Sequence, residues 1–110
     1  GNALDNIITG NDDANLISGG LGNDSLLGAG GNDTLRGQQD NDTLVGGAGA
    51  DRLEGSGGAD SYVIDALDTL VDTGGNDTVL ADFTYTLLVG FENLVLTGAA
   101  AINGGGNALD

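Results

Sequence analysis

The first half of the chain repeats with a period of nine residues. Seven consecutive units run from Gly1 to Val63, and three of the nine places keep their residue type throughout. A unit this short cannot bury an apolar face alone, so the units must stack. The three columns are Gly1, Gly10, Gly19, Gly28, Gly37, Gly46 and Gly55 at the first place, Asn6, Asn15, Asp24, Asp33, Asp42, Asp51 and Asp60 at the sixth, and Ile8, Ile17, Leu26, Leu35, Leu44, Leu53 and Tyr62 at the eighth.

Each unit divides into a loop and a short strand. The first six places hold Gly, Asn, Asp and small residues, and the last three hold strand formers, as in Ser25–Leu27 and Thr43–Val45. Alternation along such a triplet points the eighth-place side chain inward. The sequence therefore predicts an all-β fold without an amphipathic helix.

The unit Gly19–Leu27 reads Gly-Gly-Leu-Gly-Asn-Asp-Ser-Leu-Leu and fits the calcium-binding nonapeptide pattern at every specified place. Residues 1–63 thus resemble the RTX (repeats-in-toxin, haemolysin-type) family, although Gln38, Gln39 and Asp40 replace loop glycines in the fifth unit. The resemblance implies a right-handed parallel β-roll, a β-solenoid with two units per coil. Odd units would form one sheet and even units the other, with equivalent residues of alternate units stacked at about 4.8 Å.

The ninth place differs between the two expected sheets. Even units carry Arg36 and Glu54, which we expect to pair across strands for a few tenths of a kcal/mol. Odd units expose Leu27, Val45 and Val63. Either this column reflects β-propensity on a solvated sheet, or another part of the chain or a partner covers it.

The nine-residue phase is lost after Val63, but strand patterns continue at 69–71, 78–88 and 93–97. We interpret residues 64–105 as degenerate β-solenoid coils, wider and less regular than the roll, that link or cap it. Gly106–Asp110 is identical to Gly1–Asp5, which indicates the start of the next copy in a tandem array. Chance recurrence of a Gly/Asn-rich pentapeptide is the alternative.

Composition limits the partners of the chain. A net charge of −15 with two arginines excludes binding to a nucleic-acid backbone or an anionic membrane. Apolar runs stay far below the roughly 18 residues of a transmembrane helix, so we expect no membrane insertion. The 22 glycines and the self-repulsion of the acidic groups oppose folding unless a counter-ion is bound.

The expected stacking places Asp24 over Asp42 over Asp60 on one edge and Asp33 over Asp51 on the other. Unit charges about 4 Å apart repel by about 4 kcal/mol at an effective dielectric constant of about 20. A cation between each pair removes this repulsion. Ca²⁺ accepts 6–8 oxygen ligands, whereas Mg²⁺ prefers to keep its waters and a chain without His or Cys is a poor zinc ligand. We therefore predict several Ca²⁺ ions.

The number of carboxylates ranks the sites. Asp24/Asp42, Asp42/Asp60 and Asp33/Asp51 should bind best, Asn6 and Asn15 should give weaker sites, and Asp77 is a weak candidate because no aspartate stands two units away from it. The resemblance also implies ligation by backbone carbonyls of the loops. These candidates are Gly19, Gly20, Leu21, Gly22, Gly28, Gly30, Gly31, Gly37, Gln39, Asp40, Gly46, Gly47, Ala48, Gly49, Gly55, Gly57 and Gly58.

The resemblance implies a calcium-binding structural module of a secreted bacterial protein, exported unfolded by type I secretion and folded by extracellular Ca²⁺. It would act as a spacer or stalk beside neighbouring tandem repeats. The alternative is a Ca²⁺-dependent module that binds a polysaccharide or another surface ligand. Catalysis is not expected, because the carboxylates are identical and repeated and no His, Cys or Lys is present to differentiate an acid from a base.

Overall fold

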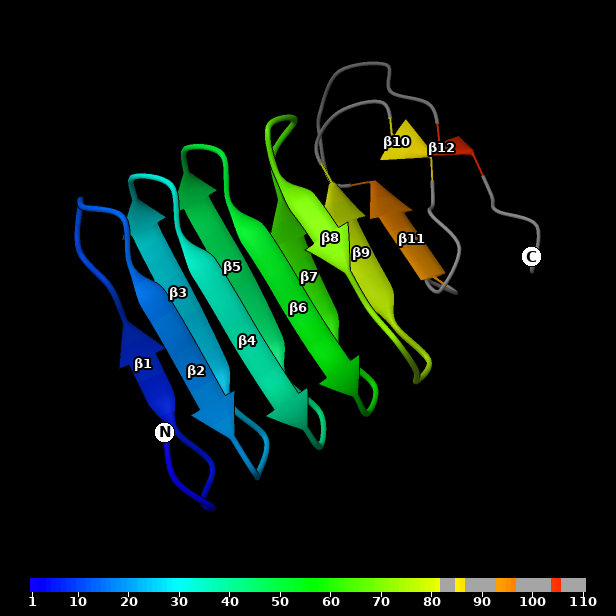
Figure 1. Ribbon diagram of the computed structural model, residues 1–110. Helices are drawn as coiled ribbons and strands as arrows, with labels where there is room; N and C mark the ends of the chain where they lie inside the picture. Colours follow the sequence, from blue (N-terminus) through cyan, green and yellow to red (C-terminus); the bar gives the residue numbers. More distant parts are fainter. Residues whose placement is uncertain (82–84, 87–92, 97–103, 106–110) are drawn as a thin grey trace.

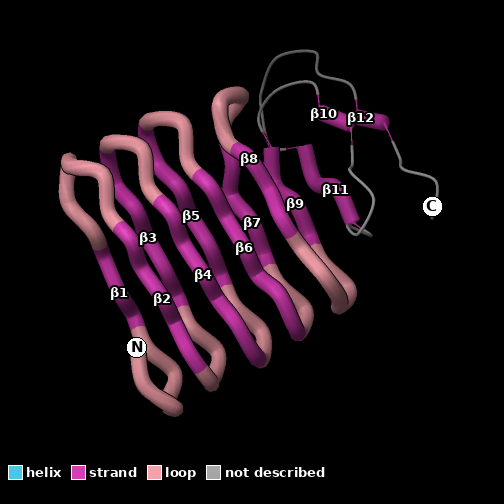
Figure 2. Tube along the Cα trace, in the orientation of Figure 1, coloured by secondary structure: helices cyan, strands magenta, loops and turns pink. Residues whose placement is uncertain are grey.

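The strands of the chain stack as two parallel sheets. The computed structural model describes residues 1–81, 85–86, 93–96 and 104–105, and this part contains strands and no helix. Figure 1 shows β1 at one end of the stack and β11 at the other, and Figure 2 shows the loops along both edges. One sheet contains β1 (Ile7–Thr9), β3 (Ser25–Gly30), β5 (Thr43–Ala48), β7 (Ser61–Ile64), β9 (Thr78–Ala81) and β11 (Asn93–Leu96). The other sheet contains β2 (Leu16–Gly20), β4 (Thr34–Gln39), β6 (Arg52–Gly57) and β8 (Thr69–Val71). A separate short pair is formed by β10 (Tyr85–Thr86) and β12 (Gly104–Gly105).

Strand pairing confirms the predicted β-solenoid. Leu26 pairs with Leu44 in the odd-unit sheet, and Leu35 pairs with Leu53 in the even-unit sheet. Equivalent residues of alternate units therefore stack, and two units form one coil. The pairs β1–β2, β3–β4, β5–β6 and β7–β8 make four such coils.

The core is the column of eighth-place side chains between the two sheets. Leu26, Leu35, Leu44, Leu53 and Tyr62 are fully buried. Each leucine buried in this way contributes about 1.5–3 kcal/mol relative to an exposed one. Residues two apart along a strand face the same side. The sixth place and the first place of the following unit, which lie two residues before and after the eighth, therefore also face inward and bring polar groups beside the core.

The coils after Val63 are shorter, not wider as predicted. Ser61 pairs with Thr78, one residue short of the two-unit step of the roll, and the step from Thr78 to its partner Asn93 is shorter still. The first shortening lies in the turn between β7 and β8. There the Asp65 carboxylate accepts a hydrogen bond from the Leu67 N–H at 2.8 Å, and the Asp65 carbonyl accepts one from the Asp68 N–H at 3.4 Å, so a tight turn replaces the glycine loop.

The strands predicted at 69–71 and 93–97 are present as β8 and β11. The alternating stretch 78–88 is divided: β9 ends at Ala81, and Tyr85–Thr86 pairs with β12 instead. Residues 82–84, 87–92 and 97–103 lie outside the described part of the chain, as does the predicted start of a further copy at 106–110.

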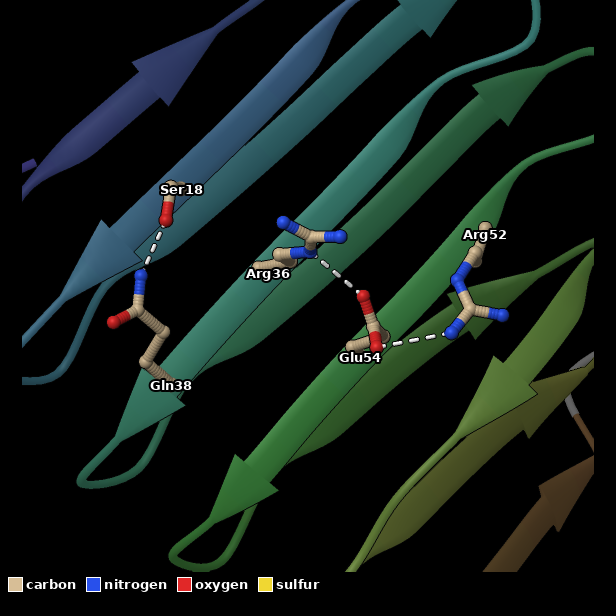
Figure 3. A network of polar contacts seen from close by, with 5 residues as sticks. All are labelled: Ser18, Arg36, Gln38, Arg52 and Glu54. Carbon is tan, nitrogen blue, oxygen red and sulfur yellow. Dashed lines mark hydrogen bonds and ion pairs between the residues drawn. The ribbon is translucent and has the colours of Figure 1, made fainter.

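The outer face of the even-unit sheet carries the predicted ion pair (Figure 3). Arg36 Nε donates to Glu54 at 2.8 Å, and Arg52 joins through its Nη2 at 3.0 Å. Gln38 donates to the Ser18 hydroxyl on the same face. Exposed pairs of this kind contribute about 0–1 kcal/mol. On the odd-unit sheet, Leu27 and Val63 remain 37% and 40% exposed, so the described residues do not cover the apolar column.

Several loop residues other than glycine adopt the left-handed backbone region. Ala29, Gln38 and Ser56 at the second place have φ of 90°, 93° and 86°, and Asp40 at the fourth place has φ of 74°. This region costs an L-residue about 1–2 kcal/mol, and Asp tolerates it better than most. The second place is glycine in the third and sixth units, where Gly20 and Gly47 have φ of 123° and 101°.

Replacing Ala29 by Gly should therefore stabilise the folded chain by about 0.5–1 kcal/mol, because relief of the strained φ exceeds the added backbone entropy of glycine. Urea unfolding at saturating calcium measures this change. The matched control is Ala48→Gly, since Ala48 ends β5 without a positive φ and should lose about 0.5–1 kcal/mol. Equal losses in both variants would contradict the strain argument.

Candidate metal centre

The sixth-place aspartates are buried inside the solenoid. Each one directly precedes a strand, and the inward-facing side chain leaves its residue only 1–3% exposed. Buried carboxylates are rare unless they are paired or coordinate a metal. The five residues that share this placement are Asp24, Asp33, Asp42, Asp51 and Asp60.

One oxygen of each carboxylate binds the backbone of the preceding coil. Asp24 Oδ1 accepts the Asn6 N–H at 2.7 Å, Asp42 Oδ1 accepts the Asp24 N–H at 2.8 Å, and Asp60 Oδ1 accepts the Asp42 N–H at 2.8 Å. The other edge repeats this contact from Asn15 to Asp33 and from Asp33 to Asp51. These hydrogen bonds fix every carboxylate between two coils.

The second oxygen of each carboxylate has no such contact. Within the described residues, Oδ2 of Asp24, Asp33, Asp42, Asp51 and Asp60 is buried and lacks a hydrogen-bond partner. An uncompensated buried charge costs several kcal/mol. A cation beside each Oδ2 satisfies both the charge and the missing contact, so the aspartates fit the predicted role.

The first-place glycines leave the space that these oxygens face. A Cβ at Gly19 would lie 2.3 Å from Asp24 Oδ2 and 2.9 Å from the Gly37 carbonyl oxygen. A Cβ at Gly28 would lie 2.3 Å from Asp33 Oδ2 and 2.4 Å from the Gly46 carbonyl oxygen. Carboxylate and carbonyl oxygens thus converge, and this is the hard oxygen ligand set that Ca²⁺ takes.

The other predicted carbonyl ligands lie along the loops. Fourth-place carbonyls stack against the next coil: the Gly31 oxygen would lie 1.9 Å from a Cβ at Gly49, and the Asp40 oxygen 2.0 Å from one at Gly58. The third-place residues Leu21, Gln39 and Ala48 are exposed, and Gln39 and Ala48 are the last residues of β4 and β5. The first-place carbonyls are therefore the ones that the structure brings to the carboxylates.

The sixth-place asparagines differ from the aspartates. Asn6 Oδ1 accepts the Asn2 N–H at 2.9 Å, and Asn6 Nδ2 donates to Asn2 Oδ1 at 3.1 Å. Asn15 makes the same two contacts with Asn11. Since these side chains are neutral and already hydrogen-bonded, they create little demand for a cation. That they form weaker sites stays a prediction.

Two further aspartates extend the columns with a shorter step. Asp77 lies one residue short of two units from Asp60, and its Oδ1 accepts the Asp60 N–H at 2.9 Å. Asp68 was missed by the sequence analysis, and its Oδ1 accepts the Asp51 N–H at 3.0 Å. The signal was present, because Asp-Thr-Leu-Val at 42–45 recurs at 68–71, out of phase by one residue.

Burial shifts the acid–base behaviour of these groups. It raises the pKa of Asp42 to about 6, and the charges of Asp60 and Asp24 add to the shift. Burial also raises the pKa of Asp68 to about 6 and that of Asp60 above its ordinary value. Without a cation, the folded chain therefore favours the protonated forms of Asp42, Asp60 and Asp68.

Fold and site together define a calcium-binding repeat module built as a β-solenoid. The sequence matches the RTX calcium-binding nonapeptide repeat (4 copies) over residues 1–35 and 27–62. The chain belongs to this family. No curated protein sequence matches the chain. Within its described part, no helix could span a membrane.

The calcium-free chain should become less stable as pH rises from about 4 to above 6. An unfolded Asp has a pKa of about 3.9, so between these values the folded state binds more protons than the unfolded state. The stabilising contribution is complete below about 4 and is lost as pH rises through about 6.

Far-UV circular dichroism in calcium-depleted buffer at pH 5 and pH 7.5 measures this effect. We expect more β-structure at pH 5, and the opposite trend at limiting calcium, because the ion binds deprotonated carboxylates. A calcium-free chain that gains β-structure at pH 7.5 would show that proton binding does not oppose the buried charge.

Proposed function

We propose that this module folds when it binds Ca²⁺ and serves as a structural spacer in a secreted bacterial protein. The observation that carries the proposal is the set of five buried Oδ2 atoms without a hydrogen-bond partner among the described residues. The net charge of −15 likewise requires counter-ions when the chain becomes compact. Both features oppose folding until divalent cations are bound.

The difference in calcium concentration between the cytosol and the outside of the cell would determine where the module folds. Extracellular calcium modules typically have Kd of about 10⁻⁴–10⁻³ M, so such sites stay empty in the cytosol and fill outside the cell. A site that binds only the folded state stabilises it by about 1.4 kcal/mol when calcium is tenfold above Kd. Three to five such sites together contribute about 4–7 kcal/mol, which is comparable to the net stability of about 5–15 kcal/mol of a folded domain.

The stalk role follows from how the solenoid is built. Each coil contacts its neighbours through the same strand pairs and carboxylate contacts, so the module lengthens by adding coils. The carboxylates are alike and repeat along both edges, which suits a structural role better than catalysis. Secretion is typical of RTX proteins and supports an extracellular location, with type I export as the route.

Calcium titration followed by far-UV circular dichroism tests the proposal. We expect little β-structure in chelator, a cooperative gain at about 10⁻⁴–10⁻³ M Ca²⁺, and a much smaller response to Mg²⁺, which retains its waters. A chain that is already β-rich in chelator at pH 7.5 would refute calcium-driven folding.

Two variants that each remove one negative charge test whether the calcium dependence of folding arises from the aspartate columns. Asp42→Asn removes a carboxylate shared by two predicted sites, and the calcium midpoint should rise at least about tenfold, which is about 1.4 kcal/mol. Asp13→Asn removes the same charge from an exposed loop residue and should shift the midpoint by less than about twofold. Equal shifts would assign the dependence to net charge and not to the columns.

A second candidate function is calcium-dependent glycan binding. A shallow hollow of about 730 Å³ lies on the loop edge, lined in part by Gln38, Gln39, Asn41, Ser56 and Thr73. Amide and hydroxyl groups are suited to hydrogen-bonding sugar hydroxyls. A pull-down with neutral polysaccharides at saturating calcium should retain the chain, and Gln39→Ala should reduce the retention. Equal recovery with and without calcium would oppose this function.

A further inference from the structure

Three carboxylates converge at the last described members of the odd-unit column. Oxygens of Asp60, Asp72 and Asp77 all lie within 4.8 Å of one another. Asp60 and Asp77 stand in the column of sixth-place aspartates. Asp72 lies five residues before Asp77, at the first place of its unit, where all seven units of the roll carry glycine. This acidic triad therefore contains one carboxylate more than the pairs of the roll.

Asp72 is held in place by three hydrogen bonds. The Tyr62 hydroxyl donates to Asp72 Oδ2 at 2.5 Å, and the backbone N–H groups of Thr73 and Gly74 donate to Oδ1 at 2.6 and 3.2 Å. Tyr62 is fully buried at the eighth place, where the other units carry Ile or Leu. The two residues that depart from the repeat, Tyr62 and Asp72, are thus in direct contact.

The Asp60 carboxylate supplies an independent sign of a ligand. Asp60 is 1% exposed, and its Oδ2 lacks a hydrogen-bond partner within the described chain. A Cβ at Gly55 would lie 2.1 Å from this oxygen and 2.1 Å from the Tyr62 hydroxyl oxygen, so both face the same space. Asp60 Oδ1 is occupied by the Asp42 N–H, which leaves Oδ2 directed toward the triad.

Positive side chains do not compensate the triad. The chain has two basic residues, and both lie on the outer face of the even-unit sheet, where Arg36 and Arg52 pair with Glu54. Three ionised carboxylates at this separation repel by several kcal/mol even at an effective dielectric constant of about 20.

We propose that Asp60, Asp72 and Asp77 form a three-carboxylate Ca²⁺ site that fills at lower calcium than the two-carboxylate pairs of the roll. Its affinity is higher because the affinity of oxygen-ligand calcium sites rises with the number of charged ligands. The Tyr62 hydroxyl acts as a positioning group that holds Asp72. The inference rests on the proposed calcium binding of the roll and adds a site of different composition. Three negative charges also match a trivalent lanthanide ion.

Terbium luminescence sensitised by tyrosine reads this site directly. The chain has two tyrosines and no tryptophan, so in a Tyr85→Phe background Tyr62 is the one side chain that sensitises Tb³⁺ efficiently at 280 nm. In a Tb³⁺ titration, we expect sensitised emission to appear at a lower Tb³⁺ concentration than the gain of β-structure seen by circular dichroism. Added Ca²⁺ should compete with Tb³⁺ and reduce the emission. Equilibrium dialysis at a calcium concentration below that of the calcium-linked gain of β-structure should give about one bound ion, and the variants that lack Asp72 should lose it.

Asp72→Gly and Asp72→Asn test the third carboxylate. Glycine restores the residue of the other units and is compatible with the fold, so the calcium midpoint of β-structure should change less than about twofold. The Tb³⁺ midpoint of sensitised emission should rise at least about tenfold, and Asp13→Asn should leave it unchanged.

Unchanged Tb³⁺ midpoints and calcium stoichiometry in both Asp72 variants would overturn the triad site while leaving calcium-driven folding intact. Absence of a calcium-linked β transition in every variant would instead reject the proposed function of the roll.

Discussion

The fold depends on a carboxylate that is only half satisfied by protein. Asp42 Oδ1 accepts the Asp24 N–H from the preceding coil, while Asp42 Oδ2 is buried with no hydrogen-bond partner among the described residues. The first contact joins two coils in a fixed register, and the second oxygen requires a cation. One side chain therefore specifies both the stacking of coils and the dependence on metal. A step of 18 residues, or two units, follows because this side chain must return to the same edge in every coil.

The two columns of aspartates end in opposite ways. On the even-unit edge, Asp68 accepts the Asp51 N–H with Oδ1 and the Asp65 N–H with Oδ2, so the last carboxylate is satisfied by backbone alone. On the odd-unit edge, Asp72 brings an additional carboxylate to Asp60 and Asp77. Loss of one loop residue closes the first column, whereas replacement of a glycine by Asp72 concentrates charge in the second. Within the described residues, the even-unit column thus finishes with a carboxylate that is satisfied by backbone hydrogen bonds, whereas the odd-unit column finishes with a cluster that demands a cation.

Periodicity made most of the fold predictable, because a constant step of two units places side chains without knowledge of the loops. It gave the stacked units and the buried eighth place, and the resemblance to the RTX family added two units per coil, hence the two sheets and the Arg36–Glu54 pair. It missed Asp68 because a deletion of one residue shortens the step while leaving the local pattern intact. It also missed the loop contacts of the fifth place, where Asn23 Oδ1 accepts the Asn41 N–H at 2.9 Å, since a hydrogen bond between coils leaves no periodic signature distinct from turn preference.

The fifth-place and sixth-place contacts run in opposite directions along the stack. A fifth-place amide such as Asn41 Oδ1 accepts from the following coil, at Ala59 N–H, whereas a sixth-place carboxylate accepts from the preceding coil. The amide contacts are neutral and need no ion. In the first coil the sixth place is itself an amide, Asn6, satisfied by Asn2. Among the described residues of the odd-unit edge, demand for a cation therefore increases from the amide of the first coil through paired aspartates to the three carboxylates around Asp72. Residue choice at one place of the repeat sets how strongly each coil depends on the ion.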